Sequence, residues 1–97
     1  MTTRKTVTPP LPTSATTRSR EALAAMLRHV GNIYTARDRT SATDYATSAR
    51  DYQRETLRAY FDCAPDELPA TLENAVYAHH AVRDAIRTAQ AHHPKTH

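Results

Sequence analysis

The chain has 97 residues and a formal net charge of +3, with 39% hydrophobic residues, no Trp, one Gly and one Cys. This length predicts a single domain whose core is too small to enclose a cofactor, so we expect none. The lone Cys63 excludes an internal disulfide and favours a reducing, cytoplasmic compartment, and no apolar run is long enough to cross a membrane.

Residues 1–17 predict a disordered or extended tail. They are rich in Thr and Pro, lack apolar periodicity, and contain the segment Pro9–Pro12, which favours polyproline II. Residues 1–20 hold four basic residues and no acidic one, whereas residues 21–97 hold nine basic and ten acidic residues. The excess positive charge therefore belongs to the tail, and the body of the chain is close to neutral.

A first helix is predicted over about 19–37, because apolar residues recur there at three- and four-residue intervals. Ser19 is the expected N-cap, with Glu21 in the first turn. The apolar face comprises Leu23, Met26, Leu27, Val30, Ile33 and Tyr34.

A second helix is predicted over about 41–62, with Thr40 or Ser41 as its N-cap. Its inner face comprises Ala42, Tyr45, Ala46, Ala49, Tyr52, Thr56, Leu57 and Tyr60. The connection that follows contains Pro65 and Pro69, which are tolerated in the first turn of a helix.

The third helix is predicted over about 69–91, and residues 93–97 are expected to fray. Its apolar face comprises Leu72, Ala75, Val76, Val82, Ile86 and Ala89. Three amphipathic helices with short connections favour antiparallel neighbours. Residues 18–92 are therefore predicted to form an all-α, up-down-up three-helix bundle. Its modest apolar area favours association of two copies.

The adjacent His79 and His80 are the most site-like pair in the sequence. Neighbouring side chains on a helix point about 100° apart, so the two cannot ligate one ion together, and no His pair at i, i+4 supports a metal site. His79 falls in the apolar sector and is expected to be a structural residue of the core or its boundary, whereas His80 is expected to be solvated. Burial of His79 would favour its neutral form and make it a pH sensor in principle. We predict no metal ligands, and a His-based metal-binding protein is the weakest alternative.

The second helix carries the candidate contact surface, because Tyr and Arg are enriched at protein interfaces. Tyr45, Tyr52 and Tyr60 can also supply core volume, and at least two of the three are expected to do so. Phe61 projects beyond the apolar face, so it either offers an exposed anchor or folds back over the end of the bundle. The predicted partner-binding residues are Arg50, Arg54, Arg58, Phe61 and Tyr52.

The expected function is non-catalytic binding of another protein by a small adaptor, inhibitor or regulator, with no catalytic residues. Arg greatly outnumbers Lys, and Ala and Thr are abundant, which is typical of high-GC bacteria and their phages. The alternative is association with nucleic acid, with phosphates bound without sequence preference by the tail. The residues of this alternative are Arg4, Lys5, Arg18 and Arg20.

Overall fold

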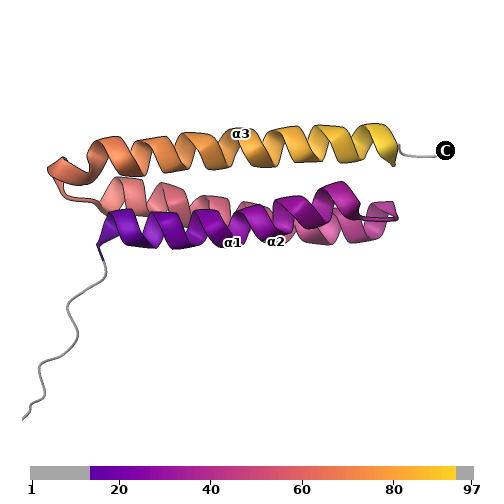
Figure 1. The fold of residues 1–97 in the computed structure, drawn as a ribbon, viewed down its shortest axis with the longest axis horizontal. Helices are drawn as coiled ribbons and strands as arrows, with labels where there is room; N and C mark the ends of the chain where they lie inside the picture. Colours follow the sequence, from indigo (N-terminus) through magenta and orange to yellow (C-terminus); the bar gives the residue numbers. More distant parts are fainter. Residues whose placement is uncertain (1–13, 94–97) are drawn as a thin grey trace, which may run out of the picture.

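A computed structural model describes residues 14–93, which form three α-helices and contain no strand. The helices are α1 (Ala15–Thr35), α2 (Arg39–Asp62) and α3 (Leu68–His92), with a short 3-10 turn, η1 (Pro65–Glu67), before the last. Figure 1 shows α2 running antiparallel to both α1 and α3. The predicted all-α, up-down-up bundle is thereby confirmed. No helix among the described residues combines the length and apolarity needed to cross a membrane.

The start of α1 differs from the prediction. Ser14 is the N-cap, and its hydroxyl oxygen accepts a hydrogen bond of 3.1 Å from the backbone N–H of Thr17. Ser19, the predicted cap, lies inside the helix and is fully buried. Its hydroxyl donates a hydrogen bond of 3.0 Å to the carbonyl oxygen of Thr16, within the same helix. Ser19 therefore does not cap the helix.

The earlier start also corrects the predicted tail. Residues 14–17 belong to the cap and first turn of α1 and are not part of a disordered segment. Residues 1–13, including Pro9–Pro12, lie outside the described residues, as do residues 94–97 of the predicted frayed end.

The N-cap of α2 is Asp38, not Thr40 or Ser41. The Asp38 carboxylate accepts a hydrogen bond of 2.8 Å from the backbone N–H of Ser41. This hydrogen bond, assisted by one from the Ser41 hydroxyl, lowers the pKa of Asp38 below its usual value. A short side chain just before the helix can reach the free N–H groups of the first turn, which is why this position suits a cap.

Hydrogen bonds at both ends of the bundle hold α1 parallel to α3. The side-chain amide of Asn74 donates to the hydroxyl of Ser19 at 2.8 Å. At the opposite end, the Nε2 atom of His93 lies 3.0 Å from the carbonyl oxygen of Ala36. These pairs are 55 and 57 residues apart in the sequence, so they fix the register between the first and last helices.

Glu67, at the start of α3, is joined to the first turn of α1. Its carboxylate accepts a hydrogen bond of 2.9 Å from the backbone N–H of Thr16. This N–H is one of the donors that the helix itself cannot satisfy. The bond lowers the pKa of Glu67 below its usual value.

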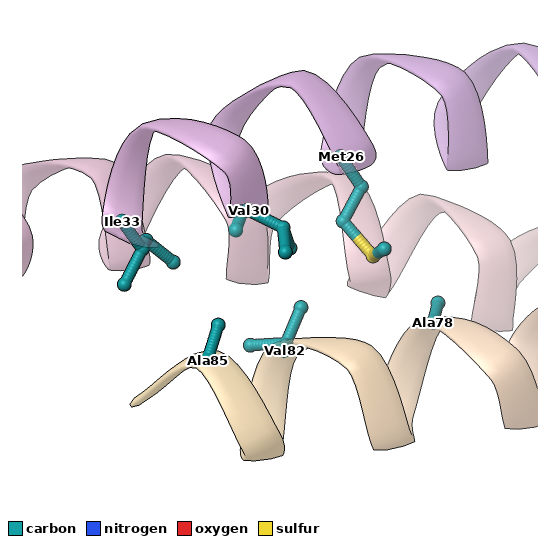
Figure 2. Packing of buried hydrophobic residues seen from close by; sticks show 7 residues of the cluster. Met26, Val30, Ile33, Ala78, Val82 and Ala85 are labelled. Atoms are coloured by element: carbon teal, nitrogen blue, oxygen red, sulfur yellow. The ribbon is translucent and has the colours of Figure 1, made fainter. Parts of the chain in front are cut away.

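The core is built mainly of alanine. Nine of its thirteen buried apolar residues are Ala, and the larger ones are Met26, Val30, Ile33 and Val82. In Figure 2, the three large side chains of α1 point toward α3, where Val82 lies between two alanines, Ala78 and Ala85. Small side chains let the helices approach closely, so the large residues beside them are left outside.

The predicted apolar faces were therefore only partly right. Leu27 and Tyr34 of α1 and Leu72 and Val76 of α3 are exposed, although their spacing matched a buried stripe. The tyrosines of α2 do not fill the core either: Tyr45 and Tyr52 are 37% and 36% exposed, and Tyr60 is half-buried. Buried alanine and threonine residues occupy the center of each inner face instead.

Candidate functional site

One side of the bundle, where α2 and α3 lie side by side, carries an exposed row of large apolar residues on each helix. On α2, Leu57 and Phe61 follow Gln53 at four-residue intervals, so the three share one side of the helix. Phe61 is the most exposed large apolar residue, at 77%. Its ring contacts that of Tyr60 edge-on, with the ring centroids 5.2 Å apart.

The matching row on α3 consists of Leu68, Leu72 and Val76, again spaced by four residues and exposed. His79 follows Val76 on the same side of α3. The side-chain amide nitrogen of Gln53 lies 3.4 Å from Nδ1 of His79, so the two rows face each other across the two helices. We call the five exposed residues of these rows the apolar strip: Leu57, Phe61, Leu68, Leu72 and Val76.

Beyond Gln53 and His79, toward the start of α2 and the end of α3, the same face is hollowed by two adjoining cavities. The first has a volume of about 260 Å³ and the second about 340 Å³, and both are lined by Arg50 and Ile86. The first exists because Ala42, Ala46 and Ala89 are too small to fill the space between the helices.

The rim of these cavities is basic. Arg39 and Arg50 line the first cavity, and Arg50, Arg83 and Arg87 line the second; together they form what we call the basic groove. No carboxylate lines either cavity among the residues that the structure describes.

The charge of the basic groove is only slightly offset by ion pairs. Arg83 contacts Asp84 at 3.4 Å, and within residues 14–93 Arg50 and Arg87 form no ion pair. Residues 14–93 contain ten basic and ten acidic residues in all. The groove is therefore a local concentration of positive charge on a neutral body.

Two of the predicted contact arginines lie away from the basic groove. Arg54 pairs with Asp51 at 2.8 Å, and Arg58 pairs with Glu55 at 2.7 Å. All four side chains are at least half exposed, so each pair contributes little to stability. Of the predicted surface, the structure brings Arg50 and Phe61 to the α2–α3 face.

Tyr52 is on the opposite flank of α2, against α1. Its ring stacks on that of His29, with centroids 5.5 Å apart and an angle of 16° between the planes. The Nδ1 atom of His29 is buried there and has no hydrogen-bond partner among the described residues. The predicted contact set therefore divides between two sides of the bundle.

The adjacent histidines form no buried site. His79 and His80 are both exposed, with ring centroids 5.4 Å apart. His79, predicted to be a core or boundary residue, does not lie in the core, because α3 buries Ala75, Ala78 and Val82 and leaves His79 exposed on its flank. Among residues 14–93, no three His, Cys, Asp or Glu side chains gather in a way that could hold a metal ion.

The four basic residues of the nucleic-acid alternative do not all belong to the segment that precedes α1. Arg4 and Lys5 lie outside the described residues, whereas Arg18 and Arg20 are exposed on α1. Arg18 lines a cavity that also contains Glu21 and Glu55, so its charge faces two carboxylates.

The sequence reasoning missed the α3 side of the face. The sequence pattern places Leu72 and Val76 on the buried face of the third helix, and it does not single out Arg83 and Arg87. The signal that could have located the buried stripe is the alanine series of α3, of which Ala75, Ala78 and Ala85 are buried.

Comparison of the chain with protein-family models, with curated proteins and with solved structures finds no match in any of the three.

Proposed function

We propose that the protein is a non-catalytic protein-binding module, a small adaptor, inhibitor or regulator whose contact surface is the α2–α3 face. The observation that carries this proposal is the position of the apolar strip outside a core made mainly of alanine. Large apolar side chains gathered on one exposed face are typical of surfaces that contact other proteins.

Covering the apolar strip would favour binding by about 25 cal/mol for each Å² of apolar surface removed from water. Phe61 is the expected anchor, because it is 77% exposed and aromatic side chains dominate the energetics of many interfaces. The paired rows on α2 and α3 suit a partner helix lying along the bundle, as in helix-in-groove recognition.

The test compares proteins captured from the lysate of the source organism by the full-length chain and by a Phe61→Ser/Leu72→Ser variant. All samples are treated with nuclease. We expect a stoichiometric protein that survives nuclease and is lost from the variant. A Tyr34→Ser/Tyr77→Ser variant is the matched control, because both residues are exposed and lie outside the apolar strip. This control should retain the partner.

Two results would overturn the proposal. One is a captured protein that binds the wild type and the Phe61→Ser/Leu72→Ser variant equally. The other is a captured set that disappears entirely with nuclease, which would favour nucleic acid. In that case, deletion of residues 1–13, which keeps the Ser14 cap of α1, would show whether Arg4 and Lys5 carry the binding.

A further inference from the structure

We propose that the basic groove binds an acidic amphipathic segment of the partner protein, with carboxylates at the arginines and apolar side chains on the apolar strip. This inference rests on the proposed function and adds to it the chemistry of the partner.

The charge of the groove is the first argument. Arg50 lies between the two cavities and lines both, and Arg87 lines the second. Neither arginine forms an ion pair within residues 14–93, so their hydrogen-bond donors are available to a ligand. A guanidinium group offers paired N–H donors that match the two oxygens of a carboxylate.

The floor of the groove is the second argument. It is apolar, with Ile86 in both cavities, Ala46 and Ala89 in the first, and Val82 in the second. Gln53 and His79, which contact each other, lie between this floor and the apolar strip on the same face of the bundle. An occupant that covers the whole face must therefore present apolar side chains along its length and carboxylates at one end.

A second copy of the chain that overlaps this face in full does not complement it. If two copies met with α2 antiparallel to α2 in full overlap, the apolar strip of each would cover the basic groove of the other. If they met in parallel, Arg50 would face Arg50. Interfaces are stabilised by complementary potentials, and juxtaposed like charges oppose association.

Nucleic acid is also less suitable than an acidic segment. A phosphate backbone has no apolar side chains to place on Leu57, Phe61 and Leu72.

The test uses a synthetic peptide of about 15 residues, roughly 22 Å long as a helix, with Leu along one face and Glu residues beside that face at one end. Binding to the full-length protein is measured by amide chemical shifts and by calorimetry. The control peptide has Gln in place of every Glu, and a single-stranded DNA oligonucleotide is the third probe. We expect shifts along α2 and α3 around Arg50 and Arg87 with the Glu peptide and much weaker binding of the Gln peptide.

Protein variants locate the binding. Arg50→Ala and Arg87→Ala should each weaken binding of the Glu peptide roughly tenfold, as expected for loss of a charge-assisted hydrogen bond. The Arg20→Ala/Arg28→Ala variant removes two exposed arginines of α1 and should bind like the wild type. Circular dichroism confirms that each variant keeps its helices.

Several results would overturn the inference: no binding of the Glu peptide, equal binding of the Gln peptide, equal binding by the Arg50→Ala and Arg87→Ala variants, or tighter binding of the oligonucleotide at the groove. A dimer in sedimentation that buries the groove would overturn it as well. If the Glu peptide fails but the lysate partner still requires Phe61 and Leu72, this inference fails alone. If the Glu peptide does not bind and no lysate partner requires Phe61 and Leu72, the proposed function is rejected as well.

Discussion

The side-chain amide nitrogen of Gln53 lies 3.4 Å from Nδ1 of His79, and this contact joins α2 to α3 at the point where the apolar strip gives way to the basic groove. On one side of the contact are exposed Leu57 and Val76; on the other, Arg50 and Arg83 line a cavity. The α2–α3 face is therefore one surface with an apolar half and a basic half.

The first prediction concerns the separation between the core and the apolar strip. We expect Leu72→Ser to change the free energy of unfolding by less than about 0.5 kcal/mol, because Leu72 is exposed. Met26→Ala should lower it by about 2–5 kcal/mol, because Met26 is fully buried and its removal leaves a cavity. Urea titration followed by circular dichroism measures both.

The contrast between these two variants is the internal control. If Leu72→Ser destabilised the bundle as much as Met26→Ala, Leu72 would belong to the core of the folded chain. The apolar strip would then have a structural explanation and would no longer support a binding surface.

The second prediction concerns the register of α1 and α3. Asn74→Ala should lower the free energy of unfolding by about 1 kcal/mol, because it removes the 2.8 Å hydrogen bond to the buried hydroxyl of Ser19. Asn32→Ala is the matched control, since Asn32 is exposed on α1. Equal melting curves for the Asn74 variant and the wild type would show that this bond does not contribute to the register.

The third prediction concerns pH. The hydrogen bond from Thr16 lowers the pKa of Glu67 in the folded state, so the ionised carboxylate stabilises the fold. This contribution is fully present above the pKa of the unfolded chain, about 4.3 for Glu, and is lost as the pH falls through the lower pKa of the folded state. We expect Glu67→Gln to melt below the wild type at neutral pH, with a difference that shrinks in acid.

Thermal melts of both proteins at several pH values measure this effect. Glu73→Gln is the control, because Glu73 is exposed on the same helix. A difference between Glu67→Gln and the wild type that stayed constant down to strong acid would argue against the Glu67–Thr16 hydrogen bond as its source.

The fourth prediction concerns the contact between α1 and α2. His29→Phe should raise the free energy of unfolding by about 1 kcal/mol, because it keeps the stacking on Tyr52 and removes a buried nitrogen that has no partner among the described residues. His80→Phe, at an exposed position, should have little effect. Destabilisation by His29→Phe would mean that the Nδ1 atom is hydrogen-bonded in solution.

The helical periodicity was sufficient to predict the fold, because apolar residues at three- and four-residue intervals on three segments leave few arrangements other than a bundle. The helix start was not predictable from capping preference alone, since Ser14 and Ser19 are equally good caps as residue types. Ser19 is buried because the side of α1 that contains it, Ala15 and Ala22 is made of small residues that pack closely.

The site could be predicted only in part. The spacing on α2 placed Arg50 and Phe61 on its outer side, but it could not show which flank of α2 would meet α3. That choice depends on the handedness of the bundle and on the register of the helices, neither of which is encoded in the pattern of one helix. For this reason the sequence pattern groups Tyr52 with Phe61, although Tyr52 stacks on His29 of α1, and it does not identify Arg87 as part of the face.

The most direct test of the α2–α3 face as a binding surface is site-specific photo-cross-linking in the source organism. A photoreactive amino acid is placed at Phe61, at Leu72 or, as controls, at Tyr34 and Tyr77, which at 52% and 54% are more exposed than Leu72 at 45%. We predict that one partner protein is cross-linked from positions 61 and 72 and from neither control. Cross-links from the control positions alone, or no cross-linked protein from positions 61 and 72, would contradict the proposed binding surface.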